Sequence, residues 1–116
     1  MDRAFGIPTA FPTIVCLCGS TRFVPAFNDA RQRLTRQGLI VLSIEIVTTQ
    51  WRADDPQHAA PEVKAMLDEL HLRKIDLADV VHILNVGGYI GPSTRAEIAY
   101  AQSLGKTITY LEKPRG

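Results

Sequence analysis

The sequence predicts a small α/β domain in which parallel strands alternate with helices. The chain has 116 residues, a length that supports one domain. Short apolar runs alternate with longer segments whose apolar residues recur every three or four positions. Glycine or proline marks most changes between the two kinds of segment. Such alternation is typical of parallel strands joined by right-handed helical crossovers.

The first half of the chain contains two of the predicted strands. Residues 13–18 form an unbroken apolar run, which is typical of a strand covered on both faces. A helix is expected next, with an inward face made of Phe23, Phe27, Ala30 and Leu34. Gly38 is expected to end this helix, and residues 39–47 are expected to form the second strand.

The second half begins with a long polar segment, residues 48–60, and loops of that length are often lids or binding loops. Pro61 is suited to start a helix, because proline favours the first helical position. The predicted buried face of this helix consists of Val63, Met66, Leu67, Leu70 and Ile75. Residues 80–86 are predicted to form the third strand.

A last helix and strand complete the pattern. Pro92 is predicted to open a helix that ends at Gly105 and turns inward Ile98, Ala101 and Leu104. Residues 107–111 are the fourth predicted strand. The expected architecture is a small flavodoxin-like or Rossmann-like three-layer sandwich with four parallel strands in the order 2-1-3-4. Ligands bind such sheets beyond the strand ends where the order reverses. We therefore expect the loops at residues 19–22 and 85–94 to meet there.

The loop after the first predicted strand carries groups suited to an anion. Gly19 allows a tight turn, and Ser20 and Thr21 offer hydroxyls. Arg22 adds a fixed positive charge at the start of a helix. A simpler alternative is that Ser20 or Thr21 only caps that helix. The loop contains neither the G-x-x-x-x-G-K-[ST] nor the G-x-G-x-x-G pattern.

The loop after the third predicted strand leads to a carboxylate. Its three glycines allow a ligand to approach the backbone closely. Ser93 and Thr94 add hydroxyls, and Glu97 follows in the next helix. A capping box from Thr94 to Glu97 is the structural alternative. Pro92 argues against that register, because proline at the first helical position makes Gly91 the N-cap and Glu97 the sixth helical residue.

These loops resemble those of a known family. The chain resembles the nucleoside 2-deoxyribosyltransferase family in the runs Cys18-Gly19-Ser20-Thr21-Arg22, Ala78-Asp79-Val80-Val81 and residues 87–101. That family includes the 2′-deoxynucleoside 5′-phosphate N-hydrolases and the pyrimidine-nucleotide N-hydrolases of nucleoside antibiotic pathways. The Gly-Gly-x-x-Gly-x-[ST]-x-x-Glu run is also similar to the phosphoribohydrolases that release cytokinin bases. Both groups cleave N-glycosidic bonds.

The resemblance implies a role for each matched residue. Glu97 matches the family's glutamate, which acts as a nucleophile or stabilises the oxocarbenium ion at C1′. In the family, two loops hold the 5′ end of the substrate or its phosphate, and they are matched by Gly19, Ser20, Arg22, Gly91 and Ser93. The predicted phosphate-binding set also includes Thr21 and Thr94. Asp79 matches an aspartate that is expected to be structural. The chain departs from the family at Cys16 or Leu17 and at Ala96, where tyrosines are common, and near His71, where an acid is found.

Three further residues are candidates for contacting the base or forming a lid: Trp51, Tyr89 and Asn85. Trp51 lies in the long polar segment and is suited to stack on a base; alternatively it packs on the sheet edge or on a partner subunit. His71 is expected on a solvated helix face; alternatively it points toward the strand ends. Cys16 and Cys18 are expected to be small core residues. No His or Cys spacing predicts a metal site, and no cofactor is expected.

The composition narrows the expected partners. Thirteen Lys and Arg against 12 Asp and Glu give a net charge of +1, so no basic face for a nucleic-acid polymer is indicated. No apolar run approaches the about 20 residues needed to span a membrane. Two cysteines two positions apart make no disulfide framework, so a reduced, cytoplasmic protein is expected. The expected partner is a small nucleoside or nucleotide.

The leading hypothesis is an enzyme that hydrolyses an N-glycosidic bond, or transfers a ribosyl or deoxyribosyl group, through Glu97. The alternative is a non-catalytic module that binds a nucleotide or an ADP-ribose-like ligand. We divide the chain into an N-terminal arm (1–12), one domain (13–112) and a C-terminal tail (113–116). So small a domain has little room for an enclosed cavity. We therefore expect an open cleft that a homodimer or higher homo-oligomer completes.

Overall fold

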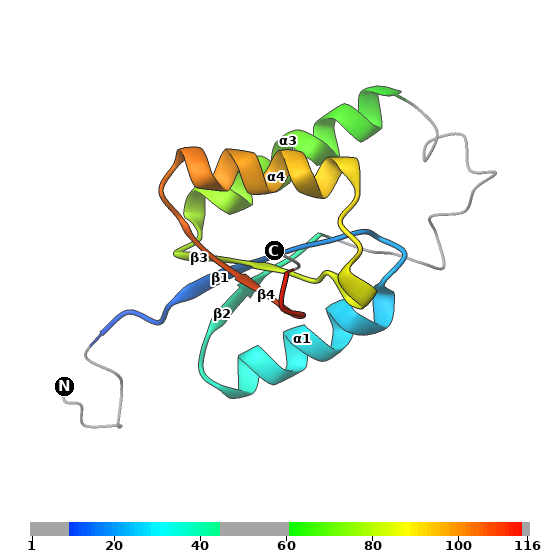
Figure 1. The fold of residues 1–116 in the computed structure, drawn as a ribbon. Helices are drawn as coiled ribbons and strands as arrows, with labels where there is room; N and C mark the ends of the chain where they lie inside the picture. The colour runs from blue at the N-terminus through cyan, green and yellow to red at the C-terminus, as the bar shows by residue number, and fades with distance from the viewer. Residues whose placement is uncertain (1–9, 45–60, 115–116) are drawn as a thin grey trace.

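The computed structural model describes residues 10–44 and 61–114. They form one sheet of four parallel strands in the order β2-β1-β3-β4, with helices on both faces (Figure 1). In chain order the elements are β1 (Ile14–Cys18), α1 (Val24–Arg36), β2 (Ile40–Leu42), α3 (Pro61–Leu77), β3 (Val80–Ile83), the 3-10 turn η1 (Val86–Gly88), α4 (Pro92–Ser103) and β4 (Thr107–Tyr110). The predicted α/β class and strand order are confirmed.

The side chains of β1 alternate between the two faces of the sheet and divide the interior into two cores. Val15 and Leu17 face α1, where they pack with Phe27, Ala30, Leu34 and Leu84. Cys16 and Cys18 face α3 and α4, where they pack with Ile75, Ala78, Val81, Ile83 and Ala101. Figure 1 shows α1 on one side of the sheet and α3 with α4 on the other. This burial on both faces explains the unbroken apolar run.

Two helices end at the predicted glycines. Gly38 follows α1 with φ of 85°, and Gly105 follows α4 with φ of 72°, a region that glycine enters without steric cost. The Gly38 N–H donates to the carbonyl of Thr35 at 2.9 Å, and the Gly105 N–H donates to that of Gln102 at 3.0 Å. These bonds satisfy carbonyls that the last helical turn leaves open.

Two strands end several residues earlier than predicted, and β4 ends one residue earlier, at Tyr110. β2 ends at Leu42, residues 43–44 are not in a strand, and residues 45–60 lie outside the described part of the chain. β3 ends at Ile83 instead of residue 86. The Leu84 N–H still donates to the Cys18 carbonyl at 2.8 Å, but the backbone then turns at Asn85 into η1. The apolar run continues past the strand because Leu84 packs into the core on the α1 side.

The predicted buried face of α3 is wrong at Met66 and Leu70, although Val63 and Leu67 are half-buried. Met66 and Leu70 are 54% and 49% exposed, whereas His71 and Ile75 are buried. In Figure 1 the N-terminal turns of α3 continue past α4, so these turns have less of the fold to pack against. Leu104, also predicted inward, is exposed because it is the C-cap residue that follows α4.

Asp79 has the structural role that the resemblance implied. Its Oδ2 accepts a hydrogen bond from the Ile14 N–H at 2.9 Å, and its own N–H donates to the Ile14 carbonyl at 2.8 Å. These two bonds align the first residues of β1 and β3. The neighbouring strands therefore end side by side, with Cys18 paired to Ile83.

Among the helices of residues 10–44 and 61–114, none is long and apolar enough to cross a membrane. The division into arm, domain and tail stays a prediction, since residues 1–9 and 115–116 lie outside the described part of the chain.

Candidate active site

The two loops that follow β1 and β3 are in direct contact, as the predicted topology requires. The Arg22 guanidinium lies over the Tyr89 ring, 4.4 Å from its centroid, and Nη2 donates to the Tyr89 hydroxyl at 3.4 Å. The Phe23 ring meets Tyr89 edge-on, with centroids 6.0 Å apart. A cation over an aromatic face is favourable even at a partly exposed site. Arg22 and Tyr89 therefore join the two candidate binding loops.

The first loop is tight because Gly19 lies against Leu84, the residue that follows β3. A Cβ at this position would stand 3.2 Å from both the Cβ and the carbonyl oxygen of Leu84. The Ser20 Oγ accepts the Arg22 N–H at 3.3 Å, and the Ser20 carbonyl accepts the Phe23 N–H at 3.0 Å. Because the N-cap of α1 is Phe23, with no side-chain cap, the alternative that Ser20 or Thr21 caps this helix is wrong.

The second loop is anchored by a residue that sequence reasoning missed, Glu112. Its Oε2 accepts the Gly87 N–H at 2.7 Å. The Asn85 amide donates to the Glu112 carbonyl and accepts the Glu112 N–H, both at 2.9 Å. Asn85 is buried, and its amide holds the loop to Glu112. This structural role differs from the predicted contact with a base. Only the adjacency of β3 and β4 in the sheet could have pointed to Glu112.

The start of α4 has the register that Pro92 predicted. Gly91 is the N-cap, and its carbonyl accepts the Arg95 N–H at 2.9 Å. Glu97 is therefore the sixth helical residue, and the capping-box alternative is wrong. Ser93 is exposed near the loop, whereas Thr94 is buried and turned toward the protein interior.

Glu97 projects from α4 into a nearly closed space on the α3 side of the sheet. Its side chain is 14% exposed, and its Oε1 lies 3.7 Å from Nε2 of His71. That oxygen is buried and has no hydrogen-bond partner among the described residues. Burial raises the pKa of Glu97 to about 7; the nearby Cys18 thiol opposes this rise, and Asp68 adds to it.

His71 is buried, so the expectation of a solvated helix face is wrong. Its side chain is 5% exposed, and its Nε2 lies 3.2 Å from the Cys18 Sγ. Burial, with a further contribution from Lys74, lowers the pKa of His71 to about 4. The imidazole is therefore neutral near pH 7, and its approach to Glu97 is not an ion pair. Its spacing of four from Ile75 is the sequence signal that places it on the inner face.

The two cysteines are buried core residues, as predicted, and both are free thiols. With His71 they place three donor atoms within 4.8 Å of one another, close enough to share a metal ion. Metal binding would require both thiols to ionise. Hydrogen bonding with Cys16, together with burial, strongly raises the pKa of the Cys18 thiol, which opposes ionisation. The Cys18 thiol is therefore neutral beside a neutral imidazole.

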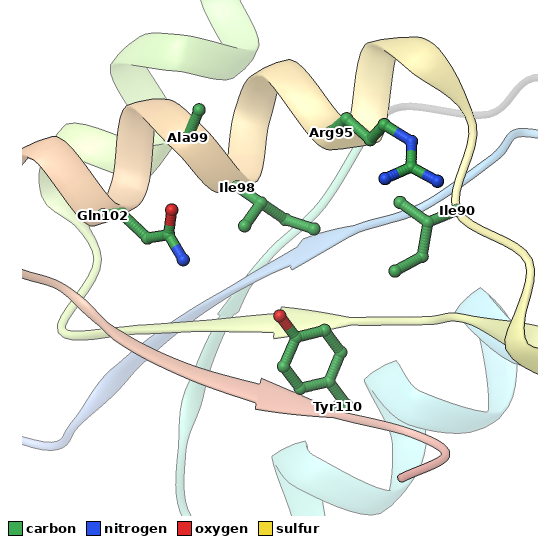
Figure 2. A pocket seen from close by; sticks show the side chains of 6 residues that line it. All are labelled: Ile90, Arg95, Ile98, Ala99, Gln102 and Tyr110. Atoms are coloured by element: carbon green, nitrogen blue, oxygen red, sulfur yellow. The ribbon is translucent and has the colours of Figure 1, made fainter. Parts of the chain in front are cut away.

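A separate pocket of about 270 Å³ lies on the other side of α4, against the edge strand β4 (Figure 2). The residues that line it are Ile90, Arg95, Ile98, Ala99, Gln102 and Tyr110. Figure 2 shows two isoleucine side chains in its centre, with polar ends of Arg95, Gln102 and Tyr110 around them. Glu97 does not line this pocket, which is thus distinct from the buried carboxyl.

The structure brings part of the predicted site together. Arg22 and Tyr89 are in contact. Glu97 lies close to His71, which in turn contacts Cys18 at the end of β1. Trp51, the predicted lid residue, lies outside the described residues. No protein-family model matches this chain, and no curated protein matches it either.

Proposed function

We propose that this protein cleaves the N-glycosidic bond of a nucleoside or nucleoside 5′-monophosphate, by hydrolysis or by transfer of the ribosyl or deoxyribosyl group, with Glu97 at C1′. The observation that carries the proposal is the buried Glu97 carboxyl, whose Oε1 has no hydrogen-bond partner among the described residues, together with the two joined loops at the strand ends. A buried acid without a partner costs stability. Proteins keep such destabilising ionisable groups most often at functional sites.

The chemistry requires Glu97 to be ionised when it meets the sugar. A carboxylate below C1′ either attacks that carbon or stabilises the positive charge that develops as the base departs. With a pKa of about 7, Glu97 is divided between its two forms near neutral pH. Positive charge developing at C1′ would favour the carboxylate form, so the interaction strengthens in the transition state.

The loops supply groups for the other end of the substrate. The exposed Arg22 and the tight turn of Gly19 and Ser20 would receive the 5′ end or its phosphate, with Ser93 beside them. The Tyr89 ring, held by Arg22 and Phe23, offers a face or edge for stacking on a base. Thr21 and Gly91 stay in the proposed phosphate-binding set, and Trp51 stays a predicted lid residue. Thr94 could take part only through its backbone N–H, because its side chain is buried.

The proposal includes a homodimer or higher homo-oligomer in a cytoplasmic setting. The described part of the chain exposes Met66, Leu70 and Leu77 along α3, which would suit burial against a second copy. Its free cysteines fit a reducing compartment. Sedimentation of the purified chain tests the assembly: a strictly monomeric species that retains full activity would contradict it.

The central test is release of free base from a panel of nucleosides and of ribo- and deoxyribonucleoside 5′-monophosphates, followed by chromatography with and without an acceptor base. We expect wild type to release base and Glu97→Gln to lose about 100-fold or more of the rate. Glu62→Gln is the matched control, because Glu62 is an exposed glutamate in the first turn of α3. Equal background from wild type and Glu97→Ala would end the proposal. Tight binding without product would instead select the non-catalytic nucleotide or ADP-ribose-like module.

A further inference from the structure

The His71 imidazole is anchored on one side only. Its Nδ1 is buried and has no hydrogen-bond partner among the residues that the structure describes. In most functional sites the distal ring nitrogen of a histidine is held by a carbonyl or carboxylate, and that bond decides which nitrogen carries the proton. At His71 neither tautomer gains a bond at Nδ1. The groups around Nε2 therefore decide the tautomer.

Two groups with different requirements face Nε2. The Cys18 Sγ lies 3.2 Å away, and the Glu97 Oε1 lies 3.7 Å away. A protonated thiol is a donor, so a bond from Cys18 requires Nε2 to be an acceptor and places the ring proton on Nδ1. An ionised carboxylate is an acceptor only, so it favours a proton on Nε2. Because sulfur is only a weak acceptor, Cys18 as a donor favours the tautomer opposite to the one that suits ionised Glu97.

We propose that His71 is a positioning residue that changes tautomer when Glu97 ionises: the ring proton is on Nδ1 while Glu97 is a carboxylic acid and on Nε2 once Glu97 is a carboxylate. The inference rests on the proposed function only for its catalytic consequence. Ionisation releases one proton from Glu97 to solvent, and the imidazole loses one proton from Nδ1 and gains one at Nε2, so it stays neutral. Cys18 keeps its proton and turns its S–H toward Glu97.

The electrostatic setting separates this exchange from ordinary titration of the histidine. The titratable and charged groups that face the pair are Cys16 and Cys18 from β1, and Lys64, Asp68 and Lys74 from α3. The pKa of His71 is lowered to about 4 and that of Glu97 is raised to about 7. Glu97 therefore titrates in a range where the imidazole is neutral throughout.

For the proposed reaction, an Nε2–H donor would hold the ionised carboxylate in one orientation. A carboxyl group with no such donor is free to rotate away from C1′. We expect His71→Leu to lower kcat by about 10- to 100-fold with a smaller change in KM. His71→Gln, whose amide can place a donor near the position of Nε2, should recover part of that loss.

The decisive experiment is nitrogen NMR of the histidines in the full chain, between about pH 5.5 and 8.5, a range that brackets the Glu97 pKa of about 7. His71→Gln assigns the His71 signals among the three histidines. In wild type, Nδ1 of His71 should give the signal of a protonated nitrogen at low pH, and Nε2 should give that signal at high pH. In Glu97→Gln one tautomer should persist across the range. At low pH, Cys18→Ser should keep the proton on Nδ1, and Cys18→Ala should weaken that preference.

The inference is overturned if wild-type His71 keeps one tautomer across the range, or if Glu97→Gln shows the same exchange. Neither outcome depends on finding a substrate. If wild type releases no base, the proposed function fails while the NMR result still stands. If base release depends on Glu97 but the tautomer does not change, only the role given to His71 is lost.

Discussion

The two faces of the sheet are built from alternate residues of the same strand, yet they differ in chemistry. On the α1 face, Val15 and Leu17 of β1 pack against Phe27 and other apolar side chains. On the opposite face, Cys18 meets the imidazole of His71. One face therefore contributes mainly stability, whereas the other buries groups that titrate. A short parallel strand can therefore support apolar packing on one face and buried titratable groups on the other, because its successive side chains point in opposite directions.

The largest expected effect on stability comes from the apolar face. Phe27 is fully buried at the centre of the α1 face, so Phe27→Ala should lower the free energy of unfolding by about 3 to 5 kcal/mol. Urea denaturation measures the loss. Phe11→Ala is the matched control, because Phe11 is 78% exposed and its removal should change stability by less than about 0.5 kcal/mol. Similar losses in the two variants would contradict the assignment of Phe27 to the core.

On the other face, Glu97→Gln should raise stability, and by an amount that depends on pH. The pKa of Glu97 rises from 4.5 to about 7 on folding, so between these values the folded state binds a proton that the unfolded state has released. Wild type therefore loses stability relative to Glu97→Gln as pH rises through this window, reaching about 3 kcal/mol above pH 7.

Urea denaturation of wild type and Glu97→Gln at a series of pH values tests this difference. Glu62→Gln serves as the control, since Glu62 is exposed. The difference in unfolding free energy between wild type and Glu62→Gln should stay the same at every pH. A stability difference between wild type and Glu97→Gln that is the same at pH 5 and pH 8 would show that Glu97 has an ordinary pKa.

A smaller effect is expected where the second loop is held to the end of β4. Asn85→Ala leaves the N–H and carbonyl of Glu112 without their partner, so we expect a loss of about 1 to 3 kcal/mol in the free energy of unfolding. Asn28→Ala, on the exposed side of α1, should cost much less. If Asn85→Ala instead leaves stability unchanged and raises KM for a nucleotide, the predicted base contact is the better account of this residue.

The smallest expected effect tests the corrected face of α3. Met66→Gln changes a half-exposed side chain and should alter the free energy of unfolding by less than about 0.5 kcal/mol. Ile75→Ala, on the same helix but fully buried, should cost about 2 to 5 kcal/mol. Thermal melts of the two variants compare them directly. A large loss from Met66→Gln would mean that this face of α3 is covered, as it would be in the proposed homo-oligomer.

Much of the fold could be predicted because its causes are local in sequence. The unbroken apolar run of β1 indicates burial on both faces of the sheet. The glycines after α1 and α4 mark helix ends, because they adopt positive φ angles there. The order of strands and helices then leaves few topologies. For the same reason the meeting of Arg22 with the second loop followed from the strand order.

Other features could not be predicted because they depend on which partner each side chain meets. Apolar periodicity located α3 but assigned Met66 and Leu70 inward, because it cannot tell where a helix extends past its neighbours. Glu112 has no motif of its own; it matters only because β4 lies beside β3. The polarity of His71 suggested a solvated position, and tertiary packing overrode it.

The sequence by itself determined the α/β class, the strand order, the two glycine loops and the register that makes Glu97 the sixth residue of α4. These follow from local backbone preference and hydrophobic pattern. Only the tertiary structure decided that Glu97, His71 and Cys18 share one buried space. The physical reason is that desolvation depends on atoms contributed by β1, α3 and α4 together, and no single segment of the chain encodes that environment.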